Sequence, residues 1–367
     1  MSVIEKFRNY VTWKRHAAMV DDLRVRHPLR YLFLEVTRRC NLHCAYCGSD
    51  CVEREQTGEL TVPEWIEIVR GIARDFTPKD IMVAVTGGEP LLKPGIFDLL
   101  AVLHAEGFRF GIVTNGTLMT PANARRVVES RMGSLTISFD GPPDVHDLLR
   151  GPGTAVKAVA AARALHEAGY KGKLEFFTTV TKPVLARIDE VRRIAALERV
   201  PLWRVAPVMP IGRAALRPDL QLDGADLRAL FDYIVRSRAD GLTPIPELCE
   251  EGYVGDDYEG RVRPYLCQCR AGITTGGIKC TGEIGACPEL SPAFDQGHIK
   301  RESLKEVWES RYQVFRDRSW TRKGECAACD VYARCKGGAL HLYENPEGDF
   351  LRCFHLMCGG KEKANEK

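Results

Sequence analysis

The chain places three cysteines close together in Cys40-Asn41-Leu42-His43-Cys44-Ala45-Tyr46-Cys47, directly after the apolar run 31–36. Three thiolates can bind three irons of a four-iron cubane and leave the fourth iron without a protein ligand. Clusters that only transfer electrons usually have four protein ligands. The C-x3-C-x2-C spacing therefore indicates a cluster with an open coordination position, which catalysis at an iron requires. A zinc knuckle or surface thiols are the alternatives.

The region from about residue 30 to 210 alternates strand-like and helix-like patterns. A capping box, Thr61-Val62-Pro63-Glu64, and a cap followed by proline, Thr120-Pro121, mark two helix starts. Short apolar runs between the helical patterns predict strands at 32–36, 81–85, 110–114, 135–139, 174–180 and 203–208. Six β/α units with short links predict parallel strands with right-handed crossovers. A complete barrel needs eight units, so the expected fold class is α/β, a partial (β/α)6 barrel with a C-terminal cysteine-rich extension.

Chemically unusual residues follow every predicted strand. The cysteine run follows the first strand, and the later strands lead into Gly87-Gly88-Glu89-Pro90, Thr114-Asn115-Gly116, Ser138-Phe139-Asp140-Gly141, Thr178-Thr179 and Pro210-Ile211-Gly212-Arg213. In parallel α/β barrels the active site lies at the carboxyl ends of the strands. These placements predict an active site at that edge.

The cysteine run, with aromatic Tyr46 before its last cysteine, resembles the signature of the radical S-adenosylmethionine (SAM) enzymes. This resemblance covers about residues 30–213. It implies that SAM fills the open iron position, and that an electron from the cluster cleaves SAM and releases a 5′-deoxyadenosyl radical. Gly87–Pro90 resembles the second signature of the family, although alone it would fit a tight turn.

The same resemblance implies roles in holding SAM. The glycine turn and the Glu89 carboxylate would bind its amino group, and Arg150 would pair with its carboxylate through a planar fork. Asn115 and Ser138 would bond the carboxylate or the ribose, and the backbone around Tyr46 would line the adenine. The implied cofactor-binding residues are Tyr46, Gly87, Gly88, Glu89, Pro90, Asn115, Ser138 and Arg150.

Ten of the 14 cysteines fall between Cys249 and Cys358. Without an export signal, such a density indicates metal or cluster ligation in a reducing cytoplasm. A C-x12-G-x4-C arrangement from Cys269 and a C-x2-C-x5-C arrangement from Cys326 resemble the SPASM extension of radical SAM enzymes that modify peptides and proteins. This resemblance implies one or two auxiliary [4Fe-4S] clusters, while a pair of zinc ribbons is the alternative.

The extension departs from its family at Ala339, where another cysteine usually ligates the first auxiliary cluster. Either that cluster is open or absent, or another cysteine substitutes. The second auxiliary cluster is expected on Cys326, Cys329, Cys335 and one of Cys353 or Cys358, with the spacing slightly favouring Cys358. Cys51 and Cys249 are expected to be spare buried thiols. The candidate metal ligands are Cys40, Cys44, Cys47, Cys267, Cys269, Cys280, Cys287, Cys326, Cys329, Cys335, Cys353 and Cys358.

Composition sets the remaining bounds. Hydrophobic residues make up 45% and charged residues 28%, as in soluble globular proteins, and the net charge of +3 gives no case for nucleic-acid binding. No apolar run approaches the roughly 18 residues of a membrane helix. The expected division is a helical segment packed on the barrel (1–29), the partial barrel (30–215), a helical linker (216–265), the cluster domain (266–358) and a disordered tail (359–367).

The leading hypothesis is a radical SAM enzyme that abstracts hydrogen from a peptide or protein, with crosslinking, epimerisation or oxidation as outcomes. A flavodoxin or ferredoxin would supply its electrons. The same chemistry on a small metabolite or tetrapyrrole is the first alternative, and a non-catalytic iron–sulfur or zinc redox protein is the second. No catalytic acid or base is assigned. Glu289, two residues after Cys287, is expected to be a solvated loop carboxylate.

Overall fold

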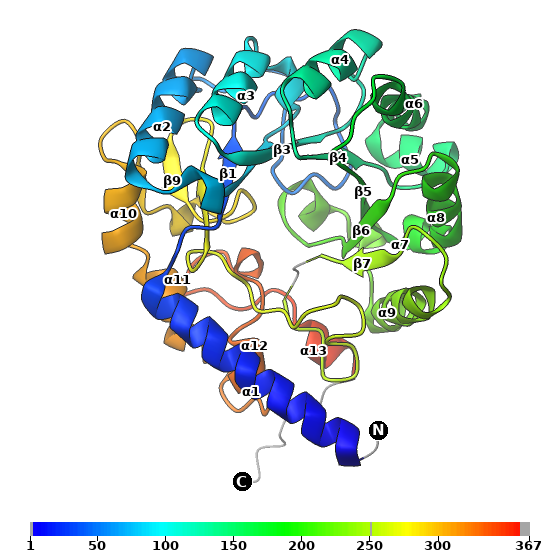
Figure 1. The fold of residues 1–367 in the computed structure, drawn as a ribbon. Coiled ribbons are helices and arrows are strands. Elements are labelled where there is room, and N and C mark those ends of the chain that lie inside the picture. The colour runs from blue at the N-terminus through cyan, green and yellow to red at the C-terminus, as the bar shows by residue number, and fades with distance from the viewer. Residues whose placement is uncertain (1–2, 250–251, 360–367) are drawn as a thin grey trace.

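The computed structural model describes residues 3–249 and 252–359, and Figure 1 shows their arrangement. Apart from Gly359, the tail expected to be disordered lies outside the described residues. Six parallel strands run in chain order through the sheet. They are β1 (Tyr31–Glu35), β2 (Met82–Thr86), β3 (Arg109–Thr114), β4 (Ser134–Ser138), β5 (Lys173–Val180) and β6 (Leu202–Pro207).

The sheet is wider than these six strands. β7 (Pro246–Leu248) adds a parallel strand beside β6, and β8 (Thr275–Ile278) adds one beside β1. Two short antiparallel strands, β9 (Glu283–Gly285) and β10 (Gly297–His298), continue from β8. Among the described strands β7 and β8 do not pair with each other, so the barrel stays open. The predicted partial barrel is confirmed. The linker adds one strand to its sheet, β7, and the extension adds three, β8, β9 and β10.

Helices cover the outer face of the sheet (Figure 1). The first of them begins as predicted: Thr61 and Glu64 exchange hydrogen bonds in a capping box, with Thr61 N donating to Glu64 Oε2 over 2.7 Å. The helices of the barrel are α2 (Val62–Asp75), α3 (Ile96–Ala105), α4 (Pro121–Glu129), α5 (Pro143–Arg150), α6 (Thr154–Glu167), α7 (Lys182–Leu185), α8 (Ile188–Leu197) and α9 (Gly224–Ala239).

The strand register brings the site motifs together. Glu35 at the end of β1 lies opposite Thr86 at the end of β2, and Leu34 lies opposite Ile278 of β8. The cysteine run and the glycine turn both follow directly after these ends. They are therefore neighbours at one edge of the sheet, as parallel strands require.

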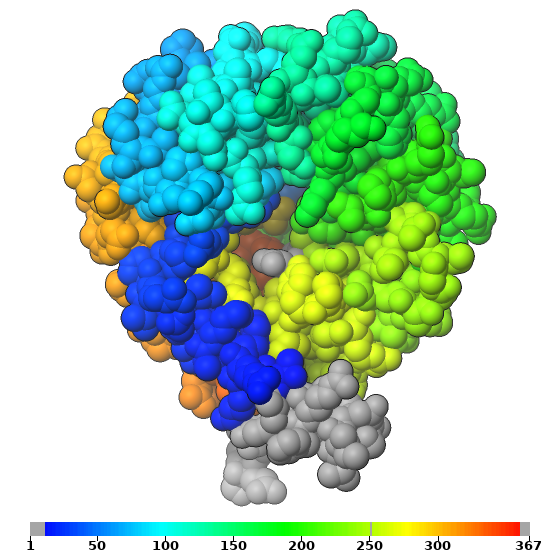
Figure 2. Space-filling view, in the orientation of Figure 1, coloured from blue at the N-terminus to red at the C-terminus, as the bar shows by residue number. Residues whose placement is uncertain are grey.

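The N-terminal helix α1 (Val3–Arg26) contacts the C-terminal region, whereas the sequence suggested packing on the barrel. The Trp13 ring meets Tyr253 edge-on at 5.8 Å, and Arg24 Nη2 donates to Gln268 over 3.4 Å. Trp13 also packs beside Val331 and Cys335. Figures 1 and 2 show α1, in dark blue, running beside the yellow and orange segments. The sequence could not reveal this position, because the residues that contact Trp13 lie on loops more than 200 residues further along the chain.

The C-terminal region consists mainly of loops with short helices, α10 (Leu304–Ser310), α11 (Gln313–Arg316), α12 (Tyr332–Cys335) and α13 (Phe354–Met357). Its buried aromatic side chains, including Trp308, Tyr312 and Phe315, belong to the same continuous core as the barrel strands. Within residues 3–249 and 252–359, no helix is both long and apolar enough to cross a membrane.

Candidate functional site

The loop after β1 folds back on itself and gathers the first three candidate ligands. Cys40 N donates to Val52 O over 2.7 Å, which closes the loop. Cys40 and Cys44 are buried and Cys47 is partly buried. Burial raises the pKa of Cys40 to about 11 and also raises that of Cys44, and each neighbouring thiolate charge raises it further. The three thiols therefore share one neighbourhood in which a positive metal centre would stabilise their charges.

This donor set fits a cluster better than a single ion. In the described part of the chain, no group of three or more Cys, His, Asp or Glu side chains is arranged to hold one metal ion. A cubane takes one thiolate for each iron, so its ligands are spread around it. Cys51 lies beside them, and its thiol donates a hydrogen bond that lowers the pKa of Cys47.

Two residues expected to bind SAM lie at the sulfur atoms. Asn115 Nδ2 lies 3.9 Å from Cys40 Sγ and donates to Asn41 Oδ1 over 3.0 Å. Arg150 Nη1 lies 4.0 Å from Cys44 Sγ. Hydrogen bonds to cluster sulfurs help to set the reduction potential. Both side chains therefore contact the loop that carries the three cysteines.

Asp140 organises the neighbourhood of Arg150, and the sequence assigned it no role. Its fully buried carboxylate accepts hydrogen bonds from Arg150 Nε and from the Tyr46 hydroxyl, and Thr179 N donates to it over 2.9 Å. Arg150 also lies over the Tyr46 ring, 5.4 Å from its centre. Its position just past the end of β4 was the feature of the sequence that could have marked Asp140 as a site residue. Ser138, two residues earlier, ends β4 and is half-buried.

The glycine turn after β2 packs directly on the segment that leads into the cysteine loop. Gly88 N donates to Thr37 O over 2.8 Å and Glu89 N donates to Arg39 O over 2.9 Å. A Cβ atom at Gly88 would lie 2.7 Å from the carbonyl carbon of Arg39, and one at Gly87 would overlap the Thr37 carbonyl. Only glycine permits this approach, which explains both glycines physically.

Glu89 is fully buried beneath this turn, and Pro90 follows it at the start of a short 3-10 helix. Its carboxylate accepts hydrogen bonds from Thr114 Oγ1 and Asn115 N, both over 2.8 Å, and from Leu91 N over 3.1 Å. Burial nevertheless raises the pKa of Glu89 to about 7. A cationic ligand group beside it would favour its charged form.

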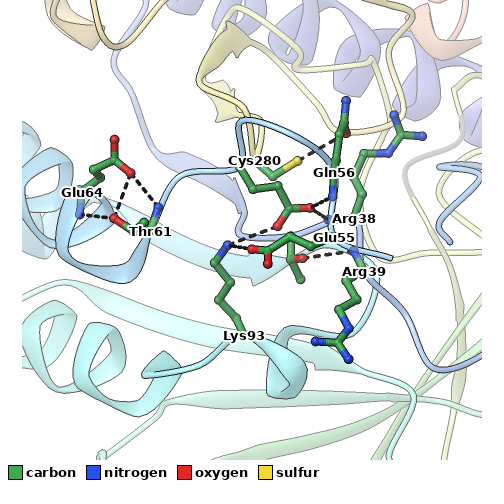
Figure 3. A network of polar contacts seen from close by, with 10 residues as sticks. Arg38, Arg39, Glu55, Gln56, Thr61, Glu64, Lys93 and Cys280 are labelled. Atoms are coloured by element: carbon green, nitrogen blue, oxygen red, sulfur yellow. Dashed lines mark hydrogen bonds and ion pairs between the residues drawn. The ribbon is translucent and has the colours of Figure 1, made fainter. Parts of the chain in front are cut away.

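A polar network missed by the sequence joins the glycine turn to the cysteine loop (Figure 3). Lys93 is buried and its Nζ donates to Glu55 over 2.8 Å and to Glu59 over 3.1 Å. Glu59 in turn accepts from Arg38 N over 2.8 Å. The network fixes the segment 55–59 between the two motifs. The sequence could not indicate this network, because its two carboxylates and one lysine have no regular spacing along the chain.

Four C-terminal cysteines line one small pocket: Cys326, Cys329, Cys335 and Cys353. Cys358 does not line this pocket, and it lies near Arg228 and Asp232 of α9 as well as near Cys353. The pocket therefore brings Cys353 together with the other three cysteines, whereas the spacing slightly favoured Cys358. The reason is that the chain pairs Tyr343 with Phe350 and returns early, which brings residue 353 back to the pocket.

The remaining cysteines are divided between separate places. The Cys269 thiol is buried, which would raise its pKa, but Arg318 and the backbone N–H groups of Leu340 and Ala271 lower it. It thus lies beside Ala339, the position of the missing cysteine. Cys287 N is close to Gly277 of β8.

Cys267 and Cys280 occupy different surroundings. Cys267 lies near the buried ion pair of Arg263 and Glu259, whose Nη2 and Oε1 are 2.5 Å apart. Cys280 sits in the turn between β8 and β9, where its Sγ donates to Gln56 Oε1 over 3.8 Å and its thiol also bonds Glu35. The structure therefore groups Cys280 with the barrel edge and not with Cys269.

A cavity of about 480 Å³ opens between the barrel edge and the C-terminal region. It is bounded by the end of β1, the cysteine loop at 48–50, the loop after β6 at 210–212, the β8–β9 turn and segments 288–295 and 341–351. Glu289, expected to be a solvated loop residue, is exposed and lies on its rim. The carboxylates that line the cavity are Glu35, Asp50, Glu283, Glu289, Asp295 and Glu344, and its lysine and arginine are Lys279 and Arg38.

Two family profiles match separate parts of the chain. The profile of the radical SAM superfamily matches residues 34–192, and that of the SPASM iron–sulfur cluster-binding domain matches residues 269–330. The AdoMet-dependent heme synthase of Nitratidesulfovibrio vulgaris is 25% identical, over 86% of this chain and 89% of its own. The mycofactocin maturase MftC of Mycobacterium tuberculosis is 28% identical, over 83% of this chain and 77% of its own.

Solved structures share the fold. The anSMEcpe enzyme with bound AdoMet superposes with a TM-score of 0.68 at 20% identity, covering 88% of this chain and 93% of its own. Streptococcus suis SuiB bound to its precursor peptide SuiA gives a TM-score of 0.69 at 18% identity, covering 88% and 75%. The chain therefore belongs to the radical SAM superfamily, as an enzyme with a SPASM domain whose cofactors are [4Fe-4S] clusters and SAM.

Proposed function

We propose that this enzyme abstracts hydrogen from a peptide or protein substrate held in the cavity between the barrel and the extension. When bound, the cluster and SAM supply a carbon radical strong enough to break a C–H bond. The chain itself holds the cysteine loop, buries the reacting region and presents the substrate. The product would be a crosslinked, epimerised or oxidised residue.

The charge of the cavity lining carries this proposal. Six carboxylates and two lysine or arginine side chains line the cavity. Asp295 is paired with Lys279 at 2.7 Å and Asp50 with Arg213 at 2.8 Å, so four glutamates remain in excess over Arg38. Polar groups of both signs suit the amides and charged side chains of a peptide, and the excess of carboxylates favours basic residues. MftC and the SuiB–SuiA complex provide the comparison with peptide-modifying proteins.

The second candidate is a tetrapyrrole or small metabolite, favoured by the match to heme synthases along most of their length. Tetrapyrroles of the heme type carry propionate carboxylates. A lining rich in Glu and Asp would repel the propionates. It would also leave their charges without a cationic partner once they are removed from water. The structure of the cavity therefore favours the peptide.

The partners follow from this chemistry. The enzyme needs a one-electron donor, for which a flavodoxin or ferredoxin is proposed, and such donors operate in the cytoplasm. We also propose that the ligand sets are Cys40, Cys44 and Cys47 for the SAM cluster, and Cys326, Cys329, Cys335 and Cys353 for an auxiliary cluster.

The test uses anaerobically reconstituted enzyme with dithionite and SAM. Any short peptide encoded beside the gene is offered in one arm and an iron–coproporphyrin in the other, and products are analysed by mass spectrometry. A mass change in the peptide that requires Cys40 supports the proposal. Glu289→Gln with Glu344→Gln should raise the KM for that peptide while leaving kcat nearly unchanged. Decarboxylation of the porphyrin with an unmodified peptide would overturn it.

A further inference from the structure

Arg213, in the loop after β6, directs all of its described contacts to the cysteine loop. Its Nε donates to Cys44 O over 2.8 Å and its Nη1 donates to Cys51 O over 2.9 Å. Its backbone N–H donates to Cys47 O over 3.0 Å. One residue thus binds three carbonyls spread along the loop that carries the three thiols.

The backbone at this point is shaped for the contact. Gly212 has a positive φ of 53°, and a Cβ atom there would lie 2.7 Å from the carbonyl carbon of Gly48. Only glycine allows the two loops to meet so closely. The result is a direct link between the loops that follow the first and the sixth strand, on opposite sides of the barrel opening.

The charge of Arg213 is less compensated than that of the other arginine at this site. The partner of Arg150 is Asp140, which is fully buried. The partner of Arg213 is Asp50, 2.8 Å away and 60% exposed, so water and salt screen its charge. Arg213 itself is only 13% exposed, and it binds the carbonyl groups of Cys44 and Cys47 directly. Its positive field therefore reaches the thiols largely unopposed.

We propose that Arg213 is a positioning residue that fastens the cysteine loop to the sixth strand and raises the reduction potential of the cluster held there. Reduction adds a negative charge to the cluster, and a nearby cation stabilises the more negative state. The inference goes beyond the proposed substrate and holds whichever substrate the enzyme uses.

The test compares reconstituted Arg213→Gln and Arg213→Lys enzymes with wild type and with Arg217→Gln. Arg217 is a matched control, because it lies four residues further on and pairs with the exposed Asp219. Iron loss to a chelator is followed by absorbance. The midpoint potential is read by electron paramagnetic resonance from the part of the spectrum that changes when SAM is added.

For Arg213→Gln we expect iron loss several-fold faster than in wild type and a lower midpoint potential. Arg213→Lys should keep a near-wild-type potential, because the charge remains, but lose iron faster, because an ammonium group cannot reproduce the guanidinium fork. Arg217→Gln should match wild type in both measurements. Wild-type iron loss and potential in Arg213→Gln would overturn the proposal. If Arg213→Gln holds no cluster, the Arg213→Lys enzyme provides the test. Iron loss at the wild-type rate, or a midpoint potential below that of wild type, in this enzyme would overturn the proposal.

Discussion

The guanidinium of Arg150 lies 4.0 Å from the Cys44 sulfur while its Nε binds the buried carboxylate of Asp140. The cysteine loop is therefore in contact with an ion pair that is closed to water. A buried arginine deprived of its partner is an uncompensated charge.

Asp140→Asn is expected to lower the free energy of unfolding by about 3–5 kcal/mol, because it leaves that charge unpaired. Urea titration under anaerobic conditions, followed by circular dichroism, measures the change. Asp144→Asn is the control, since Asp144 pairs with Arg187 on the surface, where such pairs contribute at most about 1 kcal/mol. Equal losses in the free energy of unfolding for the two variants would show that the buried ion pair stabilises the fold no more than the surface pair.

Gly88→Ala is expected to destabilise the protein by about 1–3 kcal/mol and to weaken SAM binding, because the new methyl group meets the Arg39 backbone. Equilibrium dialysis with SAM and the same urea titration provide the readouts. Gly71→Ala, in the middle of α2 with no close neighbour, should instead raise stability by roughly 0.5–1 kcal/mol. A tolerated Gly88→Ala enzyme with wild-type SAM binding would contradict the close packing described for this turn.

Glu89 gives a pH dependence with a defined sign. Its pKa is raised from 4.5 to about 7 in the folded chain, so its contribution to stability is present below pH 4.5 and is lost as pH rises through 7. Without SAM, wild type should lose up to about 3 kcal/mol relative to Glu89→Gln across this window. If the free energy of unfolding changed with pH in the same way for wild type and Glu89→Gln, the raised pKa of Glu89 would be ruled out.

Cys353→Ser is expected to remove an auxiliary cluster, while Cys358→Ser should leave it in place. Only Cys353 lines the pocket with the other three cysteines. Iron and sulfide analysis should show a loss of roughly four of each per chain in the first variant and none in the second. The opposite pattern would restore the preference that spacing gave to Cys358.

Changing Cys40, Cys44 and Cys47 together to alanine should abolish the release of 5′-deoxyadenosine and leave the C-terminal clusters in place. These thiols share no contact set with the pocket of Cys326 in the described structure. Chromatography of the reaction mixture, with iron analysis of the same sample, checks both parts. Release at the wild-type rate would disprove the assignment of the first cysteine run.

The sequence was sufficient for those parts of the fold that depend on local chemistry. The strands up to β6, the capping box at Thr61 and the motifs after each strand followed from periodicity and caps. β7 and β8 were missed because they have only three and four residues, and β8 includes Gly276 and Gly277, which strands disfavour. Their pairing is decided by tertiary contact with β6 and β1.

In the candidate site, too, the sequence indicated local motifs but not long-range contacts. Cysteine spacing predicted the candidate ligand groups. Pairings across long chain separations, such as Tyr46 with Asp140 and Arg213 with Cys44, have no local signature. The choice between Cys353 and Cys358 depended on where the chain turns back near Phe350. Such contacts are determined by tertiary packing, so no local pattern reveals them.

The position of α1 has a consequence for synthesis of the chain. Residues that contact this helix, such as Tyr253, Gln268 and Val331, are translated more than 200 residues after it. The helix therefore lacks its final partners until those later residues have been translated. Contacts of such large sequence separation form slowly, so docking of α1 is expected to be among the last folding steps. During that interval α1 is open to chaperones and proteases.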